Sequence, residues 1–167
     1  AVEGASVSLI ASADAVAING GSIKAKSGNV SINAAKDIAL NSGDITANNG
    51  NVIMTALEAV TMEAGSIRTN VVDVHAAQLN VNGGEINASR VDADQAMTLS
   101  GGTINATTVE ASQAMALNGA TVNAANVIAG TTMTISDGNV NTGDSKGLLE
   151  ATNISLTRGQ VNGTTLN

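Results

Sequence analysis

A short internal repeat runs along the whole chain and limits the folds that it can adopt. From Ser22 onward each segment has an aliphatic residue in second place and carries glycine at or next to its end. Such regular self-similarity indicates a repeat architecture in which each unit packs on its neighbours. The units span residues 1–21, 22–43, 44–65, 66–84, 85–102, 103–120, 121–138 and 139–159, followed by a partial unit at 160–167.

Each repeat contains three short stretches in which apolar and polar residues alternate. Alternation over so few residues is typical of a strand with one buried face, and a period of two excludes a helix. From one stretch to the next the first aliphatic residue advances by five, six and seven positions, and three successive repeats keep these steps. In residues 85–102 the inward pairs are Ile86 with Ala88, Val91 with Ala93, and Met97 with Leu99.

Three short strands per repeat, stacked repeat upon repeat, predict one all-β solenoid over residues 1–167. We expect a single-stranded parallel β-helix of about eight coils, and the general preference for right-handed parallel crossovers favours a right-handed coil. Equivalent residues should form inward columns along the rod. The first column is Ile23, Ile45, Ile67, Ile86, Ile104, Val122, Val140 and Val161, and the third-strand column is Leu40, Met62, Val81, Leu99, Leu117, Ile135 and Leu156.

The corner after the third strand has a constant length and carries most of the glycines. Glycine there fits a turn that needs positive φ. The expected corner glycines are Gly20, Gly21, Gly43, Gly65, Gly83, Gly84, Gly101, Gly102, Gly119, Gly138 and Gly159.

Composition agrees with a thin core and excludes several partners. The chain has no Phe, Trp, Tyr, Cys or Pro, and its formal net charge is −7. A phosphate-binding surface needs a basic stripe and usually aromatic residues, so nucleic acid is not expected as a partner. No apolar run approaches the length of a membrane span, and disulfides are excluded.

Two stretches carry a resemblance to a known group of proteins, AAKDIALNSGDITANNGNV at 34–52 and QAMTLSGGTINATTVEASQAMALNGATVNA at 95–124. They resemble the haemagglutinin-type repeats of filamentous exoproteins of bacterial two-partner secretion, and are similar to the passenger stalks of autotransporter adhesins. The resemblance covers essentially the whole chain. It implies a right-handed β-helix, export to the surface of a Gram-negative cell or beyond it, and a role in adhesion or fibre formation.

One column of asparagines is expected on the outside of the rod. These residues lie between an inward aliphatic and a small residue in five successive coils, and stacked amides can hydrogen-bond along the rod axis. The column should stabilise the rod, and its flat, uncharged surface could also receive a glycan or a neighbouring rod. Its members are Asn87, Asn105, Asn123, Asn141 and Asn162.

An acidic strip is the second candidate site. Asp73, Asp92 and Glu110 take the same outward place on the second strand of three successive coils, and Asp94 lies two positions beyond Asp92. Stacked carboxylates repel one another, so they could bind Ca²⁺ or a glycan, or they could be a solvated face that adds solubility. His75, the only histidine, points outward beside Asp73, and we interpret it as a surface residue.

These features together predict a structural protein and not an enzyme, with no cofactor. Neither end of the sequence shows a cap, so we expect axial contact of coil with coil, either with other copies of the chain or with flanking repeats of the same chain. The expected location is the cell surface or the medium, and a host or cell-surface glycan or protein is a possible partner. The alternative is a glycan-binding or polysaccharide-cleaving β-helix that uses the acidic strip.

Overall fold

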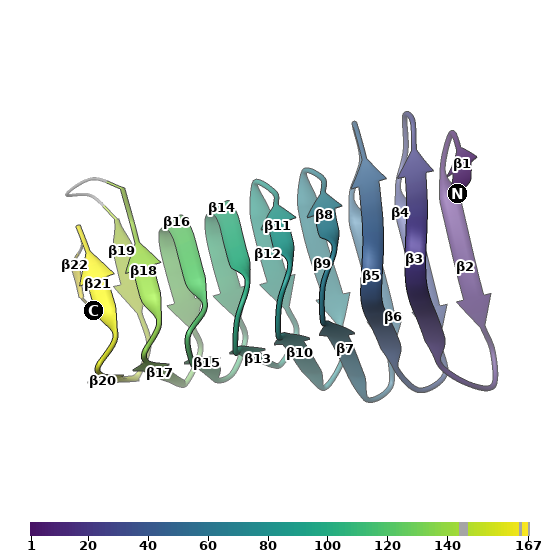
Figure 1. Ribbon diagram of the computed structural model, residues 1–167. Helices are drawn as coiled ribbons and strands as arrows, with labels where there is room; N and C mark the ends of the chain where they lie inside the picture. Colours follow the sequence, from purple (N-terminus) through teal and green to yellow (C-terminus); the bar gives the residue numbers. More distant parts are fainter. Residues whose placement is uncertain (144–146, 164, 167) are drawn as a thin grey trace.

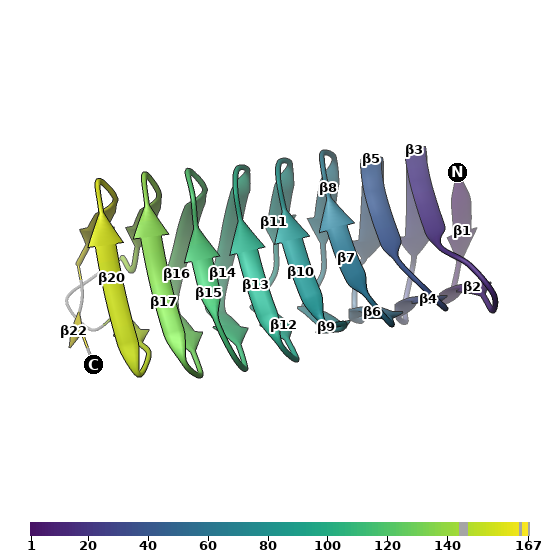
Figure 2. The same cartoon turned by 90° about the horizontal axis from the view of Figure 1, so that it is seen from below.

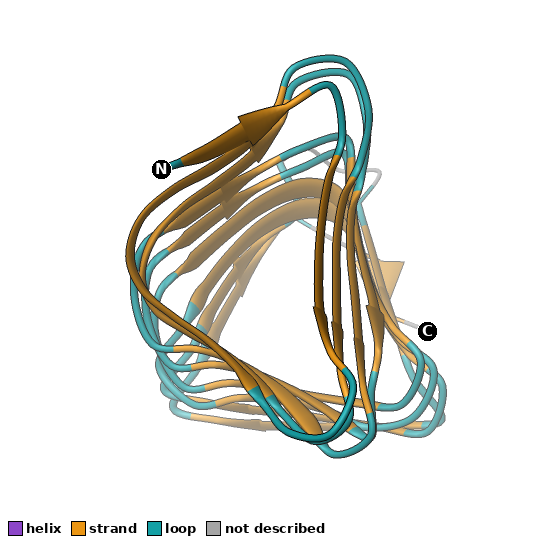
Figure 3. Cartoon of the chain, turned by 90° about the vertical axis from the view of Figure 1, so that its right-hand side faces the viewer, coloured by secondary structure: helices purple, strands orange, loops and turns teal. Residues whose placement is uncertain are grey.

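The computed structural model describes residues 1–143, 147–163 and 165–166, which form a parallel β-helix (Figure 1). In the view along the rod the chain turns clockwise as it recedes from the N-terminal coil, so the coil is right-handed (Figure 3). The cross-section is triangular, and the described residues contain strands and no helix. The predicted all-β solenoid of about eight coils is therefore confirmed.

Two of the three faces meet at a corner that some strands cross without a break. The first face contains β1 (Val2–Gly4), β8 (Ser66–Arg68), β11 (Glu85–Asn87), β18 (Asn139–Asn141) and β21 (Gln160–Asn162). The second face contains β2 (Val7–Ala11), β4 (Val30–Ala34), β6 (Val52–Ala56), β9 (Val71–His75), β12 (Arg90–Ala93), β19 (Leu148–Glu150) and β22 (Thr165–Leu166). The strands β14 (Thr103–Ala111) and β16 (Thr121–Ala129) bend from the first face into the second. The first half of each strand pairs with strands of the first face, and the second half pairs with strands of the second face.

The third face is the one seen in Figure 2, where its strands lie side by side. It contains β7 (Ala59–Met62), β10 (Gln78–Val81), β13 (Ala96–Leu99), β15 (Met115–Leu117), β17 (Thr132–Ser136) and β20 (Asn153–Thr157). The strands β3 (Val16–Ala25) and β5 (Ile38–Ala47) run from this face into the first.

Apart from a register shift where β3 pairs with β5, between Ile18 and Ser22, strand pairing places identical positions of the repeat above one another. For example, Ile86 pairs with Ile67 on one side and Ile104 on the other, and the strands are parallel. The first inward column is buried from Ile23 to Val140, and its last member, Val161, is partly buried. Burial of apolar side chains is the main term that stabilises the rod. Each coil receives this stabilisation from the two coils next to it, because it contacts no others.

One predicted core residue is exposed. Leu156 pairs in register with Ile135, as its place in the third-strand column requires, but 52% of its surface is accessible to solvent. The reason is its position in the last complete coil, because no described residue forms a coil beyond β20 that would cover it. The repeat pattern thus correctly predicts the direction of the side chain, but not its burial.

The glycine corners after the third face mostly adopt positive φ as predicted, with values from +74° to +141° at Gly20, Gly21, Gly43, Gly65, Gly84, Gly102 and Gly119. The expectation is wrong at four of the corner glycines. At Gly83 and Gly101 the positive φ belongs to the glycine that follows, Gly84 or Gly102, and at Gly138 and Gly159 it belongs to the residue before, with 60° at Asp137 and 56° at Arg158. The predicted units 139–159 and 160–167 contain residues 144–146, 164 and 167, which lie outside the described residues.

Candidate functional site

The predicted asparagine column forms a continuous ladder on the first face. The side-chain amide of each asparagine donates to the side-chain oxygen of the asparagine in the preceding coil. The four donor–acceptor distances are 2.9 Å for Asn105 to Asn87, 2.7 Å for Asn123 to Asn105, 2.8 Å for Asn141 to Asn123, and 2.8 Å for Asn162 to Asn141. Each bond links two coils, so the ladder stabilises the rod along its axis.

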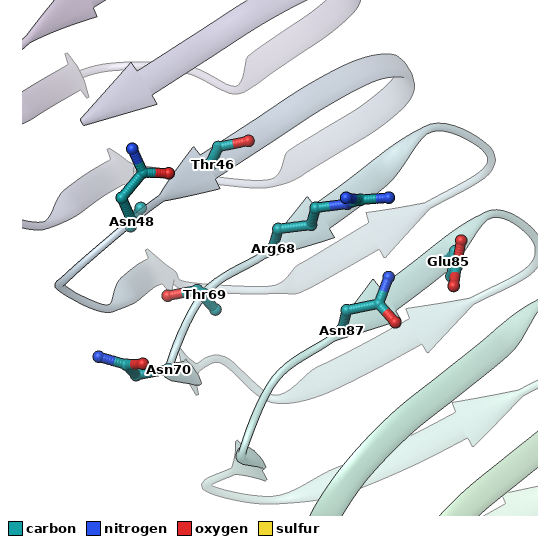
Figure 4. A pocket seen from close by; sticks show the side chains of 8 residues that line it. Thr46, Asn48, Arg68, Thr69, Asn70, Glu85 and Asn87 are labelled. Atoms are coloured by element: carbon teal, nitrogen blue, oxygen red, sulfur yellow. The ribbon is translucent and has the colours of Figure 1, made fainter. Parts of the chain in front are cut away.

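The ladder stops at Asn87 because the same register position in the preceding coil is Arg68, and those before it are Thr46 and Lys24. The coils also become shorter at this point, where the unit 44–65 is followed by the unit 66–84. An open polar hollow lies there (Figure 4). Its labelled side chains are Thr46, Asn48, Arg68, Thr69, Asn70, Glu85 and Asn87. The lining is polar, and the chain has no aromatic residue that could stack on a sugar ring.

The acidic strip stacks as predicted on the second face, with Asp92 in register between Asp73 and Glu110. Arg90, on the same strand as Asp92, is an ion-pair partner that the sequence interpretation missed. Its guanidinium lies 3.0 Å from the Asp92 carboxylate and 2.8 Å from the Glu110 carboxylate. One cation therefore offsets the repulsion between two of the stacked carboxylates, and this half of the strip does not require a bound ion.

The other half of the strip is organised around His75, which the sequence interpretation treated as a surface residue beside Asp73. Nδ1 of His75 lies 2.7 Å from the Asp94 carboxylate, and Nε2 lies 3.5 Å from the Asp73 carboxylate. The hydrogen bond to Asp94 raises the pKa of His75, and the charges of Asp73, Asp94 and Asp92 act in the same direction, whereas burial opposes them. Of the four predicted acidic residues, Asp73 and Asp94 thus share one histidine, and Asp92 and Glu110 share one arginine.

The spacing of the sequence contains a signal for this contact. Asp73 and Asp92 lie opposite each other in neighbouring coils, and His75 is as far from Asp94 along the chain as Asp73 is from Asp92. Once the coil length at this point is known, His75 must lie beside Asp94. The pairing of Arg90 with Glu110, by contrast, joins different register positions and depends on the side-chain conformation.

No family model matches the chain, and no curated protein or solved structure is significantly similar to it. Among the residues that the structure describes, no helix is long and apolar enough to cross a membrane.

Proposed function

We propose that this chain is a non-enzymatic structural rod of an exported bacterial surface fibre or adhesin. The observation that carries the proposal is the parallel pairing of coil with coil along the rod, from β1 with β3 to β19 with β22, which continues across a register shift between β3 and β5. Outside the core, hydrogen bonds and ion pairs link one coil with the next, as in the asparagine ladder. The resemblance to haemagglutinin-type repeats supports the exported location.

Axial contact between coils is the assembly mode that this geometry favours. The outer edges of β1 and β20 carry strand backbone that no described residue of the chain pairs, and Val2 and Leu156 beside them are 45% and 52% exposed. A further coil, from a second copy or from adjoining repeats, would form backbone hydrogen bonds worth roughly 0.5–1.5 kcal/mol each. Such a head-to-tail contact does not close on itself and so produces a filament or a longer stalk.

The alternative function, glycan cleavage at the acidic strip, has less support than the structural role. Most glycoside hydrolases use two carboxyl groups that flank the scissile bond. Here Asp92 and Glu110 point to the same arginine. Turnover of a polysaccharide that is lost on Asp92→Asn would contradict the structural proposal.

The test of axial assembly compares two leucines that are exposed in different places. Leu156 lies on β20, beyond which no described residue forms a further coil. Leu57, which is 75% exposed, follows β6 at a corner of the rod. At micromolar concentration the wild-type chain should form thin fibres in negative stain. Leu156→Lys should shorten them, because a charge at the stacking surface must be desolvated, and Leu57→Lys should leave their length unchanged. Dispersed monomers of the wild-type chain, or equal shortening by both variants, would contradict axial stacking.

A further inference from the structure

Three potential metal ligands converge on the outside of the second face. Asp73 and His75 both lie on β9 and point outward on either side of the buried Val74. Asp94 follows β12 one coil further along. One ligand atom from each residue lies within 4.8 Å of the others. The backbone of two paired strands holds this group, which limits how far the ligands can move apart.

The contact with Asp94 determines which ring nitrogen of His75 is available. At 2.7 Å, Nδ1–H donates a hydrogen bond to the Asp94 carboxylate, which orients the ring. In the neutral imidazole the lone pair then belongs to Nε2. This nitrogen lies 3.5 Å from Oδ2 of Asp73, which is longer than a good hydrogen bond. With His75 neutral, its Nε2 lone pair and the Asp73 carboxylate repel at this separation unless a cation, either a proton on Nε2 or a metal ion, lies between them.

The separation between Nε2 and Oδ2 matches the distance between two ligand atoms of one metal ion. Zinc–nitrogen and zinc–oxygen bonds of about 2.0–2.1 Å at a tetrahedral angle place two ligand atoms about 3.3–3.4 Å apart. A metal-bound histidine typically donates its other ring N–H to a carboxylate, which fixes the ring and raises its basicity. Asp94 stands in that place, 2.7 Å from Nδ1.

We propose that Nε2 of His75 and the carboxylate of Asp73 bind a first-row divalent transition metal such as Zn²⁺, with Asp94 as the carboxylate that orients the histidine. Water, or a donor from another molecule, completes the coordination on the solvent side, where the His75 side chain is 44% exposed. The inference goes beyond the proposed structural role and does not depend on it.

Charge and ligand type support this choice of ion. The described strip contains the carboxylates of Asp73, Asp92, Asp94 and Glu110, and the cation paired with it is Arg90. An excess of negative charge attracts a divalent ion. Ca²⁺ prefers six to eight oxygen ligands, whereas an imidazole nitrogen with one carboxylate suits zinc, nickel or copper. The imidazole therefore changes the expected ion from Ca²⁺, which the acidic residues by themselves would suggest, to a transition metal.

The test uses the full chain without an affinity tag, treated with chelator and then titrated with ZnCl₂. Because His75 is the only histidine, its ring nitrogens give the only imidazole signals in a ¹⁵N NMR spectrum. We expect saturable 1:1 binding by calorimetry and a shift centred on Nε2. His75→Gln and Asp73→Asn should abolish binding, and Asp94→Asn should weaken it about 10–100-fold. Asp44→Asn, which removes an equal charge on the first face, should bind Zn²⁺ like the wild type.

Three results would overturn the proposal. These are unchanged Zn²⁺ affinity in His75→Gln, a shift centred on Nδ1, which would make Asp94 a direct ligand, and tighter binding of Ca²⁺ than of Zn²⁺. All three substitutions in the site affect exposed or half-exposed side chains, so the variants should fold. A circular dichroism spectrum like that of the wild type verifies this, and Zn²⁺ should raise the melting temperature of the wild type but not of His75→Gln.

Discussion

Individual outward residues differ in whether they can stack on copies of themselves. An amide has both a donor and an acceptor, so the identical residues Asn105 and Asn123 hydrogen-bond directly when strand pairing places them in register. An ionised carboxylate only accepts, so stacked Asp73, Asp92 and Glu110 need a donor from elsewhere. Arg90 supplies it to Asp92 and Glu110, whereas Asp73 faces Nε2 of His75 at 3.5 Å. The same stacking geometry therefore produces a self-sufficient ladder on one face and a strip that attracts cations on another.

The ladder should contribute measurably to stability. Asn123 takes part in two side-chain hydrogen bonds, one with Asn105 and one with Asn141. Asn123→Ala should lower the free energy of unfolding by about 1–3 kcal/mol, at roughly 0.5–1.5 kcal/mol per bond. Chemical denaturation followed by circular dichroism measures this change.

A matched control lies on the same strand. Asn126 is also half-buried on β16, but its amide makes a single long bond of 3.4 Å to Thr108. Asn126→Ala should cost less than about 1 kcal/mol. Equal losses in the two variants would mean that the ladder contributes nothing beyond the ordinary effect of an Asn-to-Ala change in a strand.

At the scale of strands and corners, close stacking of backbone determines which corner residues are tolerated. Gly65 combines a φ of +94° with a position directly against the backbone of Gly43 in the preceding coil, where a Cβ would collide with the carbonyl oxygen. Asp137 and Arg158 adopt positive φ without being glycine, and their side chains form an ion pair of 3.0 Å between the two coils. A positive φ alone is thus tolerated at a corner, but a Cβ that would collide with the backbone of the neighbouring coil is not.

Two glycine substitutions separate these effects. Gly143 has a similar φ of +82° and nothing within 4 Å of a Cβ. Gly143→Ala should cost about 1–2 kcal/mol from the left-handed backbone alone. Gly65→Ala should cost about 2–5 kcal/mol, because overpacking adds roughly 1–3 kcal/mol. Thermal unfolding of both variants checks the order, and a smaller loss for Gly65→Ala would show that the coil spacing yields easily.

The whole molecule behaves as a stack in which each coil contacts only its neighbours. Three successive coils, 85–102, 103–120 and 121–138, have the same length, and Ile86, Ile104 and Val122 take equivalent places in them. The coils 85–102 and 121–138 thus present equivalent strand edges to the coil between them. A coil between them is therefore a unit that can be removed without creating a mismatch.

Deletion of residues 103–120 should leave a folded rod that is shorter by about 5 Å, the spacing of adjacent strands. The circular dichroism spectrum should remain that of a β protein, unfolding should stay cooperative, and the maximum dimension from small-angle X-ray scattering should decrease. Deletion of residues 103–111 is the control, because it removes half a coil and brings unlike corners together. We expect it to abolish folding. Loss of folding on deletion of the whole coil would mean that the coils are not equivalent.

The period of the sequence by itself determined the fold and the columns. Steps of five, six and seven positions between aliphatic residues place Ile86 on Ile104 and Asn87 on Asn105, because parallel strands in constant register bring equivalent positions together. Stacking of Asp73 under Asp92 follows from the same arithmetic. These features depend on backbone spacing, which a repeat displays directly.

Only the tertiary structure decided how the polar side chains pair, and where the core ends. The bond from Arg90 to Glu110 depends on how far a flexible side chain reaches between coils. Register places His75 beside Asp94, but the hydrogen bond of 2.7 Å between them depends on the conformations of both side chains. Leu156 has a core position in the repeat but is exposed, since burial requires a coil on both sides. The physical reason is common to all three cases: register is a property of the backbone, whereas side-chain contact and burial depend on what lies next to the residue in space.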